Sequence, residues 1–329
     1  MSFIKKNDLI FVAGHSGMVG SAITRYLKKN LYKNLLLPSR AELDLLNNKA
    51  VENYLFKFKP DVVILAAAKV GGIEANNNYP ADFILENIKI QTNIIENSWK
   101  SGVEKFLFLG SSCIYPKLAP QPLKEEYLLT GPLESTNEAY AIAKIAGIKL
   151  CSALKKQYGF NAISLMPTNL YGPGDNYNLK NSHVMPALIK KFYDANINNK
   201  SEVFCWGTGN PRREFLYVDD LAEACLFVLE NVPFKTQKEH CKINNLDGLI
   251  NIGTGEDISI KNLAEMIAKE LNYKGKIIWQ ISKPDGTPRK LLDVSKINKL
   301  GWQAKTSLKQ GIKLAIYNYE NELQNKSIL

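Results

Sequence analysis

The fold is decided by one stretch near the N-terminus, Leu9-Ile-Phe-Val-Ala13 followed directly by Gly14-His-Ser-Gly-Met-Val-Gly20. The first five residues form a short apolar run rich in β-branched and aromatic types, and a helical pattern continues from Gly20 to about Lys29. This stretch predicts a strand, a glycine turn and a helix, whose free N–H groups can hold a pyrophosphate. An ordinary glycine loop is the alternative, and the position between a buried strand and a helix favours a dinucleotide site.

Similar patterns follow along the first half of the chain. Short apolar runs at 35–37, 61–66, 105–109 and 161–166 predict further strands, and residues 81–101 predict a long helix. Strands that alternate with helices indicate an α/β fold with a Rossmann-type, doubly wound parallel sheet.

The alternation becomes irregular after Gly172. The sequence predicts helices at 182–196, 219–230 and 259–271, and strands at 202–206 and 249–252. We therefore expect two domains. The dinucleotide-binding domain comprises residues 1–172 with a return segment near 214–232, and residues 173–213 and 233–329 form mainly a smaller, mixed α/β substrate-binding domain.

The type of cofactor is indicated by Ser39-Arg40, at the end of the second predicted strand. An NAD site usually carries Asp or Glu at this point, where it binds the ribose 2′-hydroxyl, whereas an arginine accommodates the 2′-phosphate of NADP. Arg40 therefore favours NADP(H), with a solvated surface arginine as the alternative.

One helical face carries both a phenol and an ammonium in Tyr140-Ala-Ile-Ala-Lys144, because residues four apart are neighbours on a helix. A phenol with its ordinary pKa of about 10 is a poor proton donor or acceptor at neutral pH. A fixed positive charge nearby is expected to lower the pKa of the tyrosine. Tyr140 could then protonate the oxygen of a ketone that accepts a hydride. Taken alone, the pair could also be a core aromatic beside a solvated lysine.

A polar cluster, Gly110-Ser-Ser-Cys113, follows the fourth predicted strand directly. Ligands of open α/β sheets bind outside the carboxyl ends of the strands, so Ser111 and Cys113 should lie at the mouth of the same site as Tyr140. The hydroxyl of Ser111 can hydrogen-bond a substrate carbonyl there. A polar turn with a buried thiol is the alternative, and the downstream tyrosine and lysine argue against it.

Composition restricts the classes of function. The chain has 329 residues without a run of about 18 apolar ones, and its N-terminal residues lack the apolar segment of a signal peptide, so we expect a cytoplasmic protein without a membrane span. Its 5 cysteines lack paired spacing, which predicts neither disulfides nor a metal site. The net charge of +10 is dispersed, without the basic block typical of nucleic-acid binding, and fits a small anionic substrate.

Three cations of the Pro/Gly-rich loop 283–290 could close over phosphates.

Several stretches together resemble the extended short-chain dehydrogenases/reductases, in particular the epimerase/reductases that act on GDP-linked 4-keto sugars. They are Gly14–Ala22, Ala66–Gly72, Gly110–Lys117, Tyr140–Gly147, Met166–Pro173, Asn181–Val184 and Lys283–Asp293. The resemblance runs from near the N-terminus to at least Trp302. It implies a Rossmann-type fold, NADP(H) as the cofactor, a GDP-linked 4-keto sugar as the substrate, and a homodimer.

The resemblance also implies roles for individual residues. Ser111, Tyr140 and Lys144 would form the reductase triad, and Cys113 and His183 would be the base and the acid of an epimerisation. Cofactor contacts map onto Gly14, His15, Ser16, Gly17, Met18, Val19, Gly20, Arg40, Leu109, Gly110, Ser111, Ser112, Lys144, Pro167, Thr168, Asn169, Leu170 and His183. Substrate contacts map onto Lys191, Trp206, Arg213, Asp285 and Lys290.

Two positions depart from the family pattern. Ser16 stands where the family often has an arginine beside the 2′-phosphate, so the expected NADP preference depends mainly on Arg40. Lys191 stands where an arginine can contact the substrate, and it replaces a bidentate fork with a point charge.

The reaction implied by the resemblance is epimerisation of GDP-4-keto-6-deoxy-D-mannose at C3 and C5, followed by reduction at C4 with NADPH. The C4 ketone acidifies the protons on C3 and C5, so one base and one opposed acid could invert both centres. Two alternatives stay open. One is a C4-reductase of a related GDP-4-keto sugar, such as a heptose, with little or no epimerase activity; the other is a non-catalytic dinucleotide-binding regulator.

Overall fold

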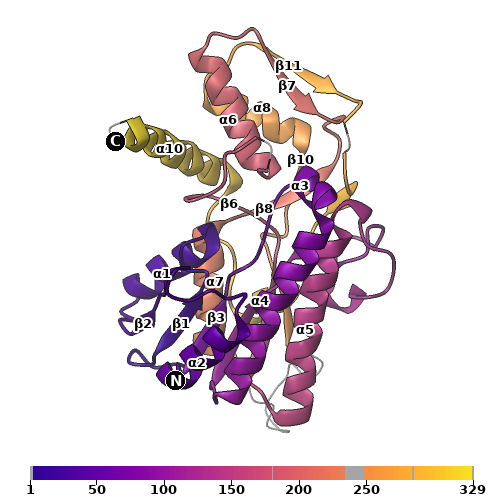
Figure 1. Cartoon of the computed structure of the whole chain (residues 1–329). Coiled ribbons are helices and arrows are strands. Elements are labelled where there is room, and N and C mark those ends of the chain that lie inside the picture. The colour runs from indigo at the N-terminus through magenta and orange to yellow at the C-terminus, as the bar shows by residue number, and fades with distance from the viewer. Residues whose placement is uncertain (1–2, 180, 234–247, 284, 328–329) are drawn as a thin grey trace.

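The computed structural model describes residues 3–179, 181–233, 248–283 and 285–327. A parallel sheet with covering helices forms the larger part of the molecule, and a smaller group of helices and short strands lies at one end of it (Figure 1). The predicted α/β fold with a Rossmann-type sheet is confirmed. None of the described helices is long and apolar enough to cross a membrane.

The large sheet has the strand order β2-β1-β3-β4-β5-β9, and every pairing is parallel. Its strands are β1 (Ile10–Ala13), β2 (Leu35–Leu36), β3 (Val62–Leu65), β4 (Lys105–Leu109), β5 (Ala162–Pro167) and β9 (Leu249–Ile252). All residues of β1, β3, β5 and β9 are buried, as expected for a parallel sheet covered on both faces. The chain progresses in opposite directions on the two sides of β1, and such a point is where open α/β sheets bind ligands.

Strand β9 lies within the range 233–329, for which the sequence predicted mainly the substrate-binding domain. In the structure it pairs with β5 as the last strand of the large sheet. A run of four apolar residues does not indicate whether the strand joins the large sheet or a sheet of the smaller part, because buried strands of either contain the same residue types. The rest of the predicted domain division stays a prediction.

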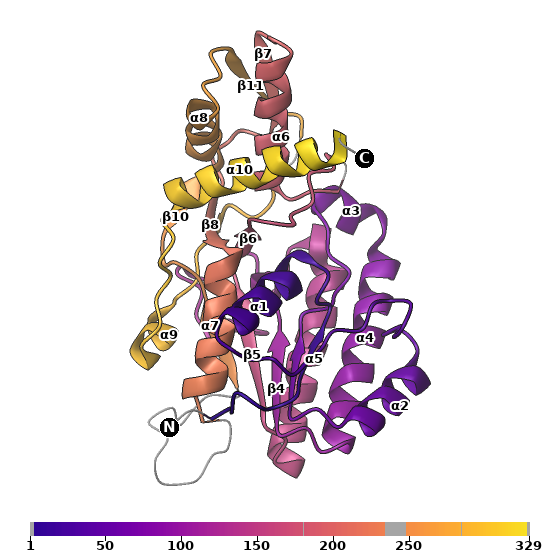
Figure 2. The same cartoon turned by 90° about the vertical axis from the view of Figure 1, so that its left-hand side faces the viewer.

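Helices cover both faces of the large sheet (Figure 2). On one face α1 (Met18–Lys29) packs against α7 (Val218–Asn231), and on the other α2 (Asn48–Phe58) and α5 (Glu138–Tyr158) flank α4 (Pro80–Lys100). Helix α7 confirms the helix that the sequence predicted at 219–230. The short helix α3 (Ile73–Asn78) precedes α4.

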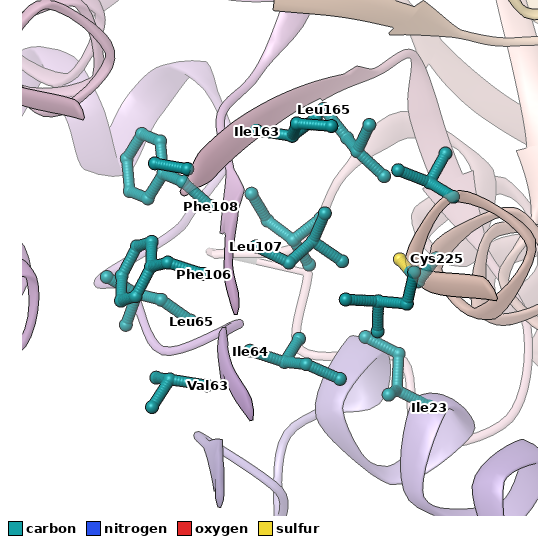
Figure 3. Close-up of a cluster of buried hydrophobic side chains, with 14 of the residues drawn as sticks. Ile23, Val63, Ile64, Leu65, Phe106, Leu107, Phe108, Ile163, Leu165 and Cys225 are labelled. Atoms are coloured by element: carbon teal, nitrogen blue, oxygen red, sulfur yellow. The ribbon is translucent and has the colours of Figure 1, made fainter. Parts of the chain in front are cut away.

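Side chains of the central strands alternate between the two faces and build the core on both (Figure 3). Ile64 and Leu107 point toward Ile23 of α1 and Cys225 of α7, whereas Phe108 points to the opposite face. All five side chains are at most 1% exposed. This core makes the sheet a rigid base for the loops at its carboxyl edge.

The smaller part has its own apolar core, to which α6 (Val184–Ile197), α8 (Ile260–Glu270) and α10 (Leu308–Ser327) contribute. Its strands are β6 (Asn169–Tyr171), β7 (Glu202–Trp206), β8 (Arg212–Tyr217), β10 (Asp257–Ser259), β11 (Lys276–Gln280) and β12 (Arg289–Lys290). Strand β8 pairs with β6, β10 and β12, and β7 pairs with β11. Helix α9 (Ser295–Leu300) follows β12 and packs near β9.

Candidate active site

The turn between β1 and α1 leaves the N-terminus of α1 open. Gly14 has a φ of +88°, and a Cβ there would meet Ala67 N at 2.6 Å, while a Cβ on Gly20 would overlap Gly14 O. Gly17 is the N-cap of α1 without a side-chain cap, and a Cβ there would have its nearest neighbour at 3.6 Å. Gly14 and Gly20 therefore shape the turn, and Gly17 leaves room for an anion at the helix N-terminus. His15 and Ser16 lie on the same turn, and Met18 and Val19 are the first residues of α1.

Arg40 follows β2 on a segment that a reciprocal pair of hydrogen bonds holds. Ser39 N donates to Glu42 Oε2 at 2.7 Å, and Glu42 N donates to Ser39 Oγ at 3.3 Å, as in a capping box. The carboxylate of Glu42, two residues after Arg40, accepts one of these bonds. Arg40 is exposed and has no hydrogen bond or ion pair with any residue that the structure describes. Its guanidinium is therefore available for a phosphate.

Lys144 is a buried cation beside Tyr140. Its residue is 4% exposed, and its Nζ donates to Leu109 O at 2.8 Å and lies 5.9 Å from the centroid of the Tyr140 ring. Burial lowers the pKa of Lys144 to about 7. Both side chains come from α5, as the sequence predicted from their spacing.

The pKa of Tyr140 is raised, which corrects the expectation that Lys144 would lower it. Burial is the largest cause, the neighbouring Cys113 adds to it, and a hydrogen bond with the Ser111 side chain opposes it. A lysine whose own pKa is near 7 is only partly charged, so its effect does not outweigh burial. The structure thus brings Ser111 and Tyr140 together, with a phenol that stays protonated, as a proton donor requires.

Cys113 receives two hydrogen bonds at its sulfur. Asn137 Nδ2 donates to Cys113 Sγ at 3.4 Å, and Lys290 Nζ donates at 3.5 Å. The turn is held by Ser111 Oγ, which accepts from Cys113 N at 3.2 Å. Cys113 is partly exposed, whereas the other described cysteines, Cys151, Cys205 and Cys225, are buried; Cys241 lies outside the described residues. An amide and an ammonium directed at one sulfur are suitable partners for a thiolate.

His183 is the N-cap residue of α6 and a second neighbour of Lys290. Burial among the surrounding groups lowers the pKa of His183, and the charge of Lys290 lowers it further. The residue as a whole is nevertheless exposed. Its loop contacts the loop after β3, where Gly72 N donates to Asn181 O at 3.0 Å. Lys290 thus lies near both residues: it donates to Cys113 Sγ, and its charge lowers the pKa of His183.

Trp206 offers an exposed indole between two lysines. Its residue is 40% exposed, and the Nζ atoms of Lys191 and Lys283 lie 5.7 Å and 5.1 Å from the ring centroid. Lys191 Nζ also donates to Phe204 O at 2.8 Å. A flat aromatic face with cations around it suits an anionic ligand with a planar base.

Three predicted ligands use their side-chain polar atoms inside the protein. Asp285 accepts from Thr208 N at 2.8 Å and from Thr208 Oγ1 at 2.9 Å, and Thr168 Oγ1 and Asn169 Nδ2 donate to Glu214 O at 3.2 Å and 2.7 Å. These side chains hold loops of the site in place. The other predicted cofactor contacts, Leu109, Gly110, Ser112, Pro167 and Leu170, lie at or directly after the carboxyl ends of β4 and β5.

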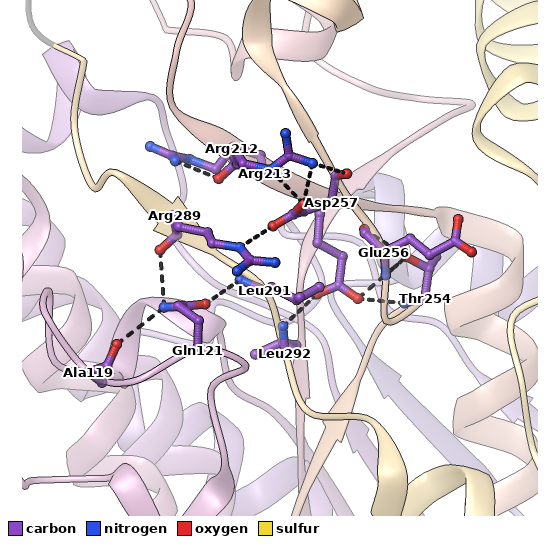
Figure 4. A network of polar contacts seen from close by, with 11 residues as sticks. Ala119, Gln121, Arg212, Arg213, Thr254, Glu256, Asp257, Arg289, Leu291 and Leu292 are labelled. Atoms are coloured by element: carbon purple, nitrogen blue, oxygen red, sulfur yellow. Dashed lines mark hydrogen bonds and ion pairs between the residues drawn. The ribbon is translucent and has the colours of Figure 1, made fainter.

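The loop 283–290 does not direct all three of its cations to one place. Lys290 reaches Cys113, but Arg289 forms an ion pair with Asp257, with Nε 2.5 Å from Oδ2 (Figure 4). Adjacent residues of a strand face opposite sides, so Arg289 points away from Cys113. The expectation that the three cations act together is therefore wrong for Arg289.

Sequence reasoning missed Asn137 and Glu134. Glu134 is buried, pairs with Lys117 at 2.9 Å, and lines a small pocket together with Cys113 and Lys290. The position of Asn137 just before the helix of Tyr140 was the only local signal for it. Its contact with a sulfur 24 positions away could not be read from that spacing.

The chain is similar to known proteins over most of its length. Residues 10–244 match the NAD dependent epimerase/dehydratase family. GDP-L-fucose synthase 1 of Arabidopsis thaliana is 55% identical over 94% of this chain and 93% of its own, and GDP-L-fucose synthase of Escherichia coli (strain K12) is 53% identical over 92% and 94%. The solved structure of MlghC, a GDP-mannoheptose C4 reductase from Campylobacter jejuni with NADP bound, is similar with a TM-score of 0.86 and 40% identity over 96% of this chain and 99% of that chain.

Proposed function

Since this chain belongs to the NAD dependent epimerase/dehydratase family and, within it, to the GDP-L-fucose synthases, we propose that it converts GDP-4-keto-6-deoxy-D-mannose into GDP-L-fucose. The enzyme epimerises the sugar at C3 and C5 and then reduces the C4 ketone. Identity above 50% to relatives named as synthases, against 40% to a heptose C4 reductase, supports this choice over the reductase.

The observation that carries the proposal is the group of Cys113, Lys290 and His183 beside Ser111 and Tyr140. Reduction of a ketone needs one proton donor, which Tyr140 supplies. The additional thiol and imidazole have a use when protons also move at the carbons next to the ketone.

In the epimerisation, Cys113 as a thiolate removes a proton from C5 or C3. The C–H bond breaks, an S–H bond forms, and the electron pair moves to O4, where the Ser111 hydroxyl can donate to the enolate oxygen. His183 then delivers a proton to the carbon from the opposite face, which inverts the centre. Burial lowers the pKa of His183 and the charge of Lys290 lowers it further; the anionic diphosphate of the substrate would offset the second of these effects.

In the reduction, Tyr140 gives its proton to O4 while C4 accepts a hydride, and its raised pKa keeps the phenol protonated until then. NADPH, when bound, supplies that hydride. The open N-terminus of α1 would hold its pyrophosphate, and Arg40 its 2′-phosphate. The NADP-bound structure of MlghC supports NADP(H) as the cofactor.

We also propose a cytoplasmic homodimer. Leu85 on α4 is 53% exposed and Ile142 on α5 is 41% exposed, and both lie in the first two turns of helices that pack side by side. Exposed apolar side chains on neighbouring helices support a subunit interface. Light scattering that reports a monomer would contradict the dimer, and fractionation that finds the protein outside the cytoplasm would contradict the location.

The proposed function is tested by solvent exchange. In deuterated water with NADPH, the unmutated enzyme should place deuterium at C3 and C5 of the product. Cys113→Ser should stop this exchange, because a hydroxyl has a much higher pKa than a thiol and supplies almost no anionic base at neutral pH. Hydride transfer to the unepimerised sugar should survive. Tyr140→Phe should show the reverse, with exchange retained and NADPH oxidation lowered about 10²- to 10⁴-fold.

Other outcomes would select the alternatives. Reduction of a GDP-4-keto hexose or heptose without deuterium at C3 and C5 would identify a dedicated C4-reductase. Binding of NADPH, with neither exchange nor oxidation on any GDP-4-keto hexose or heptose tested, would identify a non-catalytic regulator.

A further inference from the structure

Strand β12 has two residues, and each faces a different side of the β10-β8-β12 sheet. Arg289 is the register partner of Arg212, and Lys290 is the register partner of Arg213. Because side chains alternate along a strand, Lys290 and Arg213 share one face, and Arg289 and Arg212 share the other. Lys290 reaches Cys113 on the first face. A slip of β12 by one residue would remove Lys290 from that face.

On the other face, Asp257 of β10 joins the two arginines (Figure 4). Its side chain is 4% exposed, Oδ1 lies 2.6 Å from Arg212 Nη2, and Oδ2 lies 2.5 Å from Arg289 Nε. Burial raises the pKa of Asp257, but hydrogen bonds and charge from both arginines outweigh it, so the net shift is downward and the carboxylate stays charged. Without that charge, two cations would stand opposite each other on neighbouring strands, which destabilises the pair.

Other side chains hold the backbone around β12. Gln121 Nε2 donates to Arg289 O at 3.2 Å, and Leu291 N donates to Gln121 Oε1 at 2.9 Å, so this amide pairs with β12 as a neighbouring strand would (Figure 4). Leu292 N donates to Glu214 Oε2 at 2.9 Å. These bonds fix the segment next to β12, and the backbone pairs β12 with β8, where Arg212 N donates to Pro288 O at 2.9 Å. Asp257 adds a side-chain bridge between the two strands through Arg212 and Arg289.

We propose that Asp257 is a positioning residue, which holds Lys290 against Cys113 by fixing β12 in register on β8. It acts through the sheet, from the face opposite to the sulfur. The consequence for catalysis rests on the proposed function, because Cys113 is the base there. The contact between Lys290 and Cys113 can be measured without substrate.

The test is a double-mutant cycle of Asp257→Asn and Lys290→Met. In each folded variant, Cys113 is alkylated with iodoacetamide, and the rate is measured by mass spectrometry of the peptide that contains Cys113. An ammonium beside a sulfur favours the reactive thiolate, so Lys290→Met should slow alkylation about fivefold or more at pH 7. Asp257→Asn should slow it by a similar factor, and the double variant should be no slower than Lys290→Met. Additive effects, or an unchanged rate in Asp257→Asn, would overturn the positioning role.

A matched control is Asp220→Asn. Asp220 on α7 is also a buried carboxylate, and it accepts from Thr306 N at 2.8 Å and from Thr306 Oγ1 at 2.9 Å, far along the chain from β12. This control should lower the melting temperature as Asp257→Asn does, while alkylation of Cys113 stays unchanged. If Asp257→Asn does not fold, Arg289→Gln removes the same ion pair from the side of β12 and should slow alkylation to the same extent.

A second readout separates this proposal from the proposed function. The ratio of C3/C5 exchange to NADPH oxidation should fall about fivefold or more in Asp257→Asn and stay constant in Asp220→Asn. Absence of exchange in the unmutated enzyme would contradict the function, while the alkylation cycle would still test the register. Normal exchange and normal alkylation in Asp257→Asn would contradict the positioning role and leave the function intact.

Discussion

Lys144 is a cation in a place that disfavours charge. Its Nζ donates to a backbone carbonyl, and burial is the cause of its lowered pKa of about 7. Lys144 therefore lowers the free energy of unfolding at every pH at which the unfolded chain would keep this lysine protonated. That cost is consistent with a group retained for the chemistry of Tyr140 rather than for the fold.

We expect Lys144→Met to raise the melting temperature of the protein more at pH 6 than at pH 9. The folded pKa of about 7 lies below the unfolded value of 10.5, so the penalty is complete below pH 7 and shrinks as the pH rises toward 10.5. Methionine keeps most of the volume and removes the charge. Thermal unfolding at both pH values, with the unmutated protein measured in parallel, checks this. If Lys144→Met raised the melting temperature more at pH 9 than at pH 6, burial of the charge would not be the cause of the stability difference. Ketone reduction should be lost at either pH.

Arg40 decides the choice between NADPH and NADH in our proposal. Arg40→Ala should lower kcat/KM for NADPH roughly 10- to 100-fold, as expected for loss of charge-assisted hydrogen bonds, and should change that for NADH little. Arg25→Ala is a suitable control, since Arg25 is a surface arginine on α1 that pairs with Asp219. If Arg40→Ala lowers both values equally, the guanidinium does not bind the 2′-phosphate.

At the scale of elements, the glycines of the β1–turn–α1 unit differ in why they are needed. Gly17 leaves room for a ligand, whereas Gly20 is required by the packing of the turn itself. Gly17 has an ordinary φ of −77°, and a Cβ there would make only an ordinary contact with Gly14 O at 3.6 Å, whereas a Cβ at Gly20 would overlap the backbone of Gly14. The same substitution at these two glycines of one turn should therefore have different consequences.

Gly17→Ala should leave the melting temperature nearly unchanged and weaken NADPH binding about tenfold or more, because the methyl group occupies the place of the pyrophosphate. Gly20→Ala should destabilise the protein by about 1–3 kcal/mol, as overpacking does, and weaken binding as a consequence. Calorimetric titration with NADPH and thermal unfolding measure the two effects. Normal NADPH binding by Gly17→Ala would place the pyrophosphate elsewhere.

At the scale of the whole molecule, the candidate site is assembled from both parts. Cys113 and Tyr140 come from the large sheet and its helix α5, whereas His183, Trp206 and Lys290 come from the smaller part. In the proposed reaction, the proton donor Tyr140 comes from the larger part, and the cations Lys191 and Lys290 come from the smaller part. The proposed reaction therefore needs the two parts in contact.

The sequence by itself determined the strand–turn–helix unit at Leu9–Lys29 and the pairing of Tyr140 with Lys144. Both depend on residues that are close along the chain, so periodicity, glycine positions and helical spacing suffice to predict them. It also predicted the strands of the large sheet, β7, and the helices α1, α4, α6, α7 and α8 within a few residues of their ends. It did not predict α2, α10 or the strands β6, β8, β10, β11 and β12.

The tertiary structure alone decided the raised pKa of Tyr140, the place of β9 in the large sheet, and the opposite directions of Arg289 and Lys290. Burial depends on everything that packs around a group, and a strand of two residues carries no periodicity of its own. The contact between Lys290 and Cys113 joins residues 177 positions apart, and packing of the two parts brings them together.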